Sequence, residues 1–284
     1  MKRTFLYILA ALLAASCKNN SIQNNKSEGD KPVITVTIEP LRYFTEAIAG
    51  DNFNVISMVP KGSSPETYDP TPQQLVDLAK SKAYFRIGYI GFEQTWMDKL
   101  TDNAPHLQFF DTSRGIDLIY DSSHAHHHHD ADEPHAHDSI QDDEHQHLLG
   151  VEPHVWSSAY NAQIIAGNIV NALCAIDKGN EEVYMERYKS LCNQIEHTDS
   201  LICHMLSAPN ADRAFMIYHP ALSYFARDYG LHQISIEENG KEPSPSHLKN
   251  LIDTCKKRKS VLSSCNLNLT VAMRRSSPNR RERR

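Results

Sequence analysis

Hydrophobic and polar positions follow two alternating patterns along the first half of the chain. Residues 33–38, written VITVTI, are rich in β-branched residues and lie between prolines, which predicts a strand. The pattern then changes to that of a helix, which Gly50 ends. The same pairing recurs as far as residue 110. We expect strands over 33–38, 53–59, 83–87 and 106–110, and helices over 41–49, from Thr71–Pro72 onward, and over 93–100.

Two longer helical patterns follow, over residues 161–175 and 181–206. In the longer one, apolar residues recur at spacings of three and four with one gap of seven, which predicts a single buried seam with Asn180 as the N-cap. At 1.5 Å per residue this helix would be about 39 Å long, enough to span two lobes. The seam consists of Tyr184, Tyr188, Leu191, Ile195, Ile202 and Met205.

The strand and helix alternation restarts after Pro209, with strands expected over 214–218 and 233–236 and helices over 222–229 and 246–257. Such alternation indicates parallel sheets covered on both faces. We therefore predict an α/β protein in which two parallel-sheet lobes are joined by one long rigid helix, with the ligand site between the lobes. The expected parts are an N-terminal lobe (33–180), a linking helix (181–207) and a partial C-terminal lobe (208–258).

The first 17 residues have a cationic start, an apolar run and small residues before Cys17, which predicts a secretory signal too short to span a membrane comfortably. The ending AASC resembles a bacterial lipobox, in which Cys17 is lipid-modified; a plain signal peptide cut near Ser16 is the alternative. Residues 18–32 are polar and unpatterned, as in a flexible tether. We expect an exported protein, lipid-anchored to a bacterial membrane and facing the periplasm or cell surface.

Charge separates the end of the chain from the rest. The 284 residues carry a formal net charge of -6, yet residues 256–284 hold 10 Lys and Arg against one acidic residue. The second lobe needs further strands, but this region offers one short apolar patch and then arginines. We interpret residues 259–284 as an aberrant basic tail from a frame shift or truncation, which leaves the second lobe incomplete. Because an exported acidic protein gives little reason for a nucleic-acid arm, no nucleic-acid partner is expected.

Residues 124–147 hold nine histidines and seven acidic residues. Such a segment cannot form a core, and imidazole and carboxylate groups suit borderline divalent cations. An embedded purification tag is the alternative, but tags are terminal and lack interspersed acids. We predict a low-affinity metal loop. Its histidines are His124, His126, His127, His128, His129, His135, His137, His145 and His147.

A defined site needs ligands on rigid elements, and three ligand-type side chains are expected at strand-to-helix loops. Glu66 lies between two prolines in the loop GSSPETYDP, His154 lies in EPHVWSS before a helix, and His219 ends a predicted strand in MIYHPALSYF. Taken singly, each is more often a turn residue or a packed or capping histidine than a ligand. Together they occupy the places where open α/β sheets bind ligands.

Several segments carry a resemblance to a known family: IEPLRYFTEAIAG, GSSPETYDP, the histidine-rich insertion, EPHVW, YHPALSYFARDYGL and ISIEENGKEPSPSHL. From about Val33 to Lys257 the chain resembles the solute-binding lipoproteins of bacterial zinc and manganese ABC importers. The resemblance implies a monomeric receptor that captures zinc and delivers it to an ABC permease and its ATPase, without enzymatic activity. The long histidine-rich insertion is typical of the zinc branch.

The resemblance also implies a ligand set. His154 and His219 match the second and third metal ligands of the family, and Glu66 stands where the first ligand is usually a histidine. The last ligand, an acidic residue near the C-terminus, has no match because the arginine-rich tail replaces that region. Zn²⁺ is the expected metal, with Mn²⁺ as the alternative, and carboxylate oxygen is an acceptable zinc ligand.

Three other functions remain open: a manganese receptor of the same family, a zinc hydrolase with Glu66 as general base, and a surface protein for zinc buffering or cell adhesion. The hydrolase lacks an HExxH motif and a helix that carries two ligands in register. We therefore predict no catalytic residues.

Overall fold

The computed structural model describes residues 31–120, 150–237 and 242–257. The signal segment with Cys17, the histidine-rich loop 124–147 and the basic tail 259–284 lie outside the described residues. The predictions made for them stay predictions.

The first half of the described chain forms a four-stranded parallel sheet in the order β2-β1-β3-β4. Its strands are β1 (Val33–Val36), β2 (Asn54–Ser57), β3 (Ala83–Arg86) and β4 (Gln108–Asp111). In the central strand β1, Ile34 pairs with Val55 on one side and Ala83 on the other. All three are buried, as expected of a parallel sheet covered on both faces. The predicted strands are confirmed with slightly shorter bounds.

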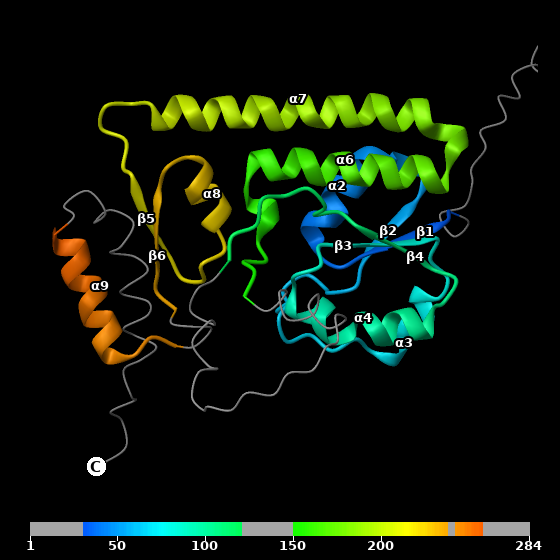
Figure 1. Ribbon diagram of the computed structural model, residues 1–284, viewed down its shortest axis with the longest axis horizontal. Coiled ribbons are helices and arrows are strands. Elements are labelled where there is room, and N and C mark those ends of the chain that lie inside the picture. Colours follow the sequence, from blue (N-terminus) through cyan, green and yellow to red (C-terminus); the bar gives the residue numbers. More distant parts are fainter. Residues whose placement is uncertain (1–30, 121–149, 238–241, 258–284) are drawn as a thin grey trace, which may run out of the picture. The chain divides into compact units, whose positions relative to one another are not determined.

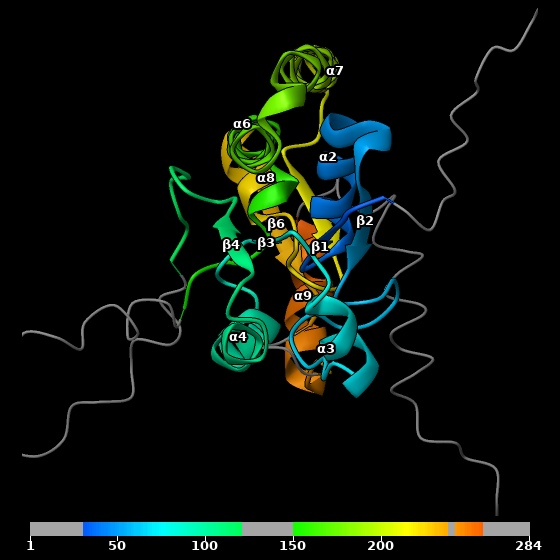
Figure 2. The same cartoon turned by 90° about the vertical axis from the view of Figure 1, so that its right-hand side faces the viewer.

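Helices cover both faces of this sheet, with α2 and α6 on one face and α3 and α4 on the other (Figures 1 and 2). The helices are α2 (Glu39–Ala49), α3 (Pro72–Leu78), α4 (Gly91–Asn103) and α6 (Ala159–Ile176), with short 3-10 turns η2 (Gly50–Asn52) and η4 (Val155–Ser157). The chain runs outward from β1 to β2 and then back to β3, and right-handed crossovers in opposite directions place their helices on opposite faces. Because of this reversal, the carboxyl ends of the neighbouring strands β1 and β3 form a topological switch point. Ligands bind to such sheets at this place.

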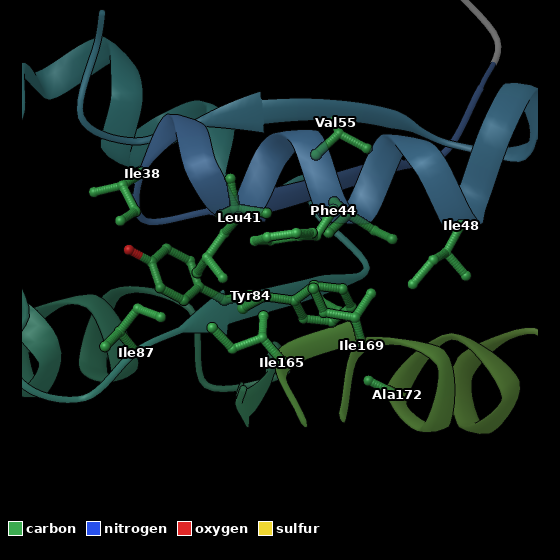
Figure 3. Packing of buried hydrophobic residues seen from close by; sticks show 14 of the residues in the cluster. Ile38, Leu41, Phe44, Ile48, Val55, Tyr84, Ile87, Ile165, Ile169 and Ala172 are labelled. Atoms are coloured by element: carbon green, nitrogen blue, oxygen red, sulfur yellow. The ribbon is translucent and has the colours of Figure 1, made fainter. Parts of the chain in front are cut away.

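The main core lies between α2, the sheet and α6 (Figure 3). Leu41 and Ile48 of α2 and Ile165 and Ile169 of α6 are fully buried. Helix α6 is long and apolar enough to cross a membrane by length and composition alone. Its apolar character is explained by burial in this core instead.

The predicted long helix is confirmed as α7 (Glu181–Leu206), which follows the turn η5 (Lys178–Asn180) and packs on α6 and α2 (Figure 1). Asn180 occupies the N-cap position but caps nothing, because its side-chain amide donates to Asp177 Oδ2 at 2.8 Å. The predicted seam is buried at Tyr184 but fails at its end, where Met205 is 71% exposed. The difference arises because α6 and α2 cover the first part of α7.

The rest of the described chain forms a second parallel sheet of two strands, β5 (Ala214–Ile217) and β6 (His232–Ser235), with α8 (Ser223–Asp228) and α9 (Pro245–Lys257). Its buried cluster within the described residues is small, with Met216, Ile234, Ile236 and Leu251. Two parallel α/β sheets and one long helix confirm the predicted fold class.

One side chain of α8 belongs to the main core. Tyr224 is fully buried there, and its hydroxyl accepts from Ile119 N at 3.1 Å and donates to Glu152 O at 2.9 Å. These two hydrogen bonds attach α8 to the segments that flank residues 121–149.

Candidate metal centre

The loop after β2 is fixed by hydrogen bonds at both ends. Thr71 and Gln74 form a capping box that starts α3, and the Gln74 amide donates to Met58 O at 2.7 Å. Tyr68 donates its hydroxyl hydrogen to Gln74 Oε1 at 2.7 Å, and Trp96 Nε1 donates to Asp69 Oδ1 at 3.1 Å. The loop is therefore attached to both α3 and α4, which agrees with a stiffened rather than a loose GSSPETYDP segment.

Glu66 docks on the start of α4. Gly91 N donates to Glu66 Oε2 at 3.0 Å, and Phe92 N donates to Pro65 O at 2.9 Å. The N-cap residue Ile90 has no polar side chain, so the Glu66 carboxylate satisfies a helix N–H that would otherwise lack a partner. A Cβ atom at Gly91 would lie 2.5 Å from Glu66 Oε2 and 2.8 Å from Glu66 O. Only glycine permits this close approach.

A buried carboxylate that sequence reasoning missed holds the neighbouring turn. Glu93 is 1% exposed; its Oε1 accepts from Ile87 N at 2.9 Å, and its carboxylate also accepts from Gly88 N and from the Thr37 hydroxyl. Burial raises the pKa of the Glu93 carboxyl, and these hydrogen bonds oppose that effect. Thr37 follows β1 and Gly88 follows β3, so Glu93 anchors the switch point between these strands.

His154 is held in place by Glu152, which lies two residues earlier in the chain. Glu152 Oε1 accepts from His154 N at 3.0 Å and also contacts His154 Nδ1. The His154 ring lies against Trp156, with centroids 5.2 Å apart, and the residue is 8% exposed. A cavity of about 210 Å³ lies between Trp156 and the loop that contains Pro65. His154 is therefore held by Glu152 and Trp156, and Trp156 borders the same cavity as the loop that carries Glu66.

His219 is held on the other side by a carboxylate from the neighbouring strand. It follows β5, and Glu237 follows β6, so the parallel pairing brings them together at the carboxyl ends of the strands. His219 Nδ1 lies 3.2 Å from Glu237 Oε2, and Glu237 N donates to Tyr218 O at 2.9 Å. The His219 side chain is 46% exposed, so it is less enclosed than that of His154.

The two histidines meet through their other ring nitrogens. His154 Nε2 and His219 Nε2 are 3.2 Å apart, and the ring centroids are 5.0 Å apart. Two nitrogens bound to one tetrahedral zinc at 2.0–2.1 Å would be separated by about 3.3–3.4 Å. The two rings thus already have nearly the spacing that a shared zinc ion requires.

Of the three predicted ligands, the structure brings His154 and His219 together, while the Glu66 carboxylate is engaged at Gly91. Across residues 31–120, 150–237 and 242–257, no three His, Cys, Asp or Glu side chains converge in the manner of a metal site. The three-residue ligand set stays a prediction.

Glu152 and Glu237 were not singled out by sequence reasoning. The local signal for Glu152 was its spacing in E-P-H, which places a carboxylate two residues before a candidate ligand. Glu237 gave no local signal, because only the pairing of β5 with β6 brings it to His219.

Comparison with known proteins decides the family. The family model described as zinc-uptake complex component A, periplasmic (ZnuA), matches residues 34–263. The chain belongs to the ZnuA family. Membership agrees with the resemblance found in the sequence, and the match includes His154, His219 and the loop with Glu66.

Relatives of this chain carry names for three metals, which are zinc, manganese and iron. The high-affinity zinc uptake system protein ZnuA of Bacillus subtilis is 29% identical over 247 residues, which cover 85% of this chain and 73% of the relative. The manganese ABC transporter substrate-binding lipoprotein PsaA of Streptococcus anginosus is 26% identical over 268 residues, which cover 90% of this chain and 77% of the relative.

A solved structure supports the fold of the ZnuA family for this chain. A zinc-bound ZnuA deletion mutant superposes with a TM-score of 0.68 at 31% identity, covering 86% of this chain and 87% of that one.

Proposed function

We propose that this chain is an extracytoplasmic receptor that captures zinc and delivers it to an ABC permease for uptake. The observation that carries the proposal is the pair of imidazoles whose Nε2 atoms face each other at 3.2 Å, each with a carboxylate at its Nδ1. Its role is binding and release rather than catalysis. The relatives named for zinc uptake and manganese transport support a transport function.

Zinc is favoured over manganese by the donor atoms. Imidazole nitrogen suits zinc, whereas Mn²⁺ is better matched by carboxylate, carbonyl and water oxygens. A site built on His154 and His219 therefore favours zinc. Manganese remains the second candidate, because a manganese-transport relative matches 90% of the chain.

Glu66 is proposed as the third ligand. Its loop borders the same cavity as Trp156, which packs on His154. A change of side-chain rotamer together with a movement of the loop would bring the carboxylate toward the histidines. Ligation would require Glu66 to leave Gly91 N, so the start of α4 would lose its carboxylate cap on metal loading. Water or a histidine of the loop 124–147 would complete the site.

The proposal also assigns roles to Cys17 and to the histidine-rich loop 124–147. Lipidation of Cys17 would anchor the exported protein, in line with the lipoprotein relative. The nine histidines of residues 124–147 would collect zinc weakly and raise its concentration near the tight site. We propose a monomer that docks on the permease and does not bind nucleic acid.

The test is a metal competition titration of the chain that starts at residue 18 and lacks residues 124–147, against a chromogenic chelator. We expect about one tight zinc per chain and weaker manganese binding. His154→Ala and His219→Ala should each lower zinc affinity by at least about 100-fold, more than loss of an outer partner does. His197→Ala, an exposed histidine on α7, serves as the matched control and should bind zinc like the parent.

A titration in which His154→Ala and His219→Ala bind zinc like the His197→Ala control would contradict the proposed site. Tighter manganese than zinc binding would shift the assignment to the second candidate.

A further inference from the structure

The two histidines have the same kind of partner, because each has a glutamate carboxylate at its Nδ1 atom. Glu152 lies at Nδ1 of His154 and Glu237 lies at Nδ1 of His219, and both glutamate side chains are mostly enclosed, at 15% and 13% exposed. The order of groups is carboxylate, imidazole, imidazole, carboxylate. The gap of 3.2 Å between the Nε2 atoms lies at its centre.

The chemistry of the groups fixes which ring nitrogen faces the centre. An ionised carboxylate can only accept hydrogen bonds, so each imidazole next to it must donate from Nδ1. A neutral imidazole that carries its hydrogen on Nδ1 has a lone pair on Nε2. With a metal ion between the rings, both lone pairs face that ion; without it, the contact of 3.2 Å between the two Nε2 atoms is a hydrogen bond, for which one of them carries a hydrogen.

We infer that Glu152 and Glu237 are positioning residues of the zinc site, which hold His154 and His219 in the tautomer and orientation that bind the metal. This inference rests on the proposed function. Partners of this kind orient metal-bound histidines, and their loss lowers metal affinity by about 10–100-fold.

Glu152 also ties its histidine to the second sheet. Its Oε2 accepts from Ser223 Oγ at 3.3 Å, and Gln233 Nε2 donates to the same Ser223 Oγ at 3.2 Å. Ser223 starts α8, and Gln233 lies in β6. A hydrogen-bonded path therefore runs from His154 through Glu152 to the element that neighbours Glu237, so the orientation of the first ligand depends on the presence of the second sheet.

The two positions are not equivalent. Glu152 contacts both the backbone N–H and the ring of His154, whose side chain is 11% exposed, so water cannot easily replace it. Glu237 contacts only the ring of His219, whose side chain is 46% exposed. We expect Glu152 to have the larger effect.

The experiment measures zinc affinity and histidine tautomers in Glu152→Gln and Glu237→Gln, again in the chain that lacks residues 124–147. Each change keeps the side-chain size but offers an amide that can donate to Nδ1. We expect zinc affinity to fall by about 10–100-fold, more for Glu152→Gln. Nitrogen-15 NMR of the metal-free protein should show His154 and His219 with hydrogen on Nδ1 in the parent and a shift toward Nε2–H at the altered position. His154→Ala and His219→Ala identify the two signals.

Two controls separate positioning from general damage. Glu196→Gln changes an exposed glutamate on α7 and should leave affinity and tautomers unchanged. Ser223→Ala removes the hydrogen bond to Glu152 Oε2 but leaves the contact between Glu152 and His154 in place. The tautomer of His154 should therefore remain that of the parent.

Zinc affinity within about twofold of the parent together with unchanged tautomers in both glutamine variants would overturn the inference. In that case a large loss in His154→Ala and His219→Ala would leave the proposed function standing. Zinc binding that survives both histidine changes would instead remove the proposed function itself.

Discussion

The two sheets follow the same rule of construction but differ in how much they bury. The four-stranded sheet has α2 and α6 packed on one face and a large continuous core, whereas the two-stranded sheet has a buried cluster of four residues within the described chain. The proposed zinc site takes one histidine from each side of this division. Stability is therefore concentrated in the first sheet, while the proposed metal binding would depend equally on the second.

The largest effects on stability should come from the same change, isoleucine to alanine, made separately in each of the two cores. Ile34 of β1 and Ile236, just after β6, are each fully buried. Ile34→Ala should lower the free energy of unfolding by about 3–5 kcal/mol, and Ile236→Ala by about 2 kcal/mol, because fewer neighbours surround its cavity. Urea unfolding gives the global values, and hydrogen exchange should show the Ile236→Ala effect mainly in β5 and β6. Equal global losses would remove the proposed difference between the sheets.

Gly91→Ala tests the close approach of Glu66 to the start of α4. The new Cβ would collide with Glu66 Oε2 at 2.5 Å and with Glu66 O at 2.8 Å, so the loop must move away from α4. We expect a loss of up to about 3 kcal/mol in unfolding free energy, as for other overpacked sites. Gly179→Ala is the matched control, because its Cβ meets nothing closer than Asp177 Oδ1 at 4.0 Å. Thermal melts that fall equally for both variants would contradict the close approach.

Tyr224→Phe tests the connection between the two sheets. The change leaves Ile119 N and Glu152 O without their hydroxyl partner at a fully buried position. The expected loss is about 1–2 kcal/mol, measured by urea unfolding, with a fall in zinc affinity as α8 loosens. Tyr43→Phe, at a residue 58% exposed, should change neither quantity. A zinc affinity that stays unchanged in Tyr224→Phe would mean that α8 is held by its other contacts.

The smallest effect is a pH dependence from Glu93 at the switch point. Because burial raises its pKa above the ordinary value of 4.5, the folded state binds this proton more tightly than the unfolded state. The stability from this group is complete below pH 4.5 and is lost as pH rises through the raised pKa, by at most about 1.4 kcal/mol per pH unit. Glu93→Gln lacks this slope, so the difference between parent and variant in urea unfolding should shrink with rising pH. A constant difference would contradict the raised pKa.

Much of the fold could be predicted because it depends on local patterns. Short apolar runs such as residues 33–38, helix stops such as Gly50 and the long pattern of 181–206 each specify their own element. The bounds were less accurate. Asn180 does occupy the predicted N-cap position, but its side chain forms no capping hydrogen bond because its amide donates to Asp177, a contact that no pattern encodes.

The site was only partly predictable, because some of its contacts depend on tertiary structure rather than on local patterns. His154 and His219 could be singled out because each is a ligand-type residue at a strand-to-helix loop, and the structure brings their rings together. Glu237 was not found, because it reaches His219 only through the pairing of β5 with β6. Glu93, which holds the ends of β1 and β3, was missed as well, because its contacts arise from tertiary packing. The docking of Glu66 on Gly91 required the position of α4, which lies 25 residues further along the chain.

The packing of Trp156 on His154 gives the protein an optical signal of its own. The sequence has two tryptophans, Trp96 and Trp156. Trp156 lies 5.2 Å from the His154 ring, while Trp96 contacts Asp69 and Lys99 instead. In a Trp96→Phe background, the fluorescence of a single indole would therefore report the state of the neighbouring imidazole. Zinc arrival and departure could be followed in real time without any added dye.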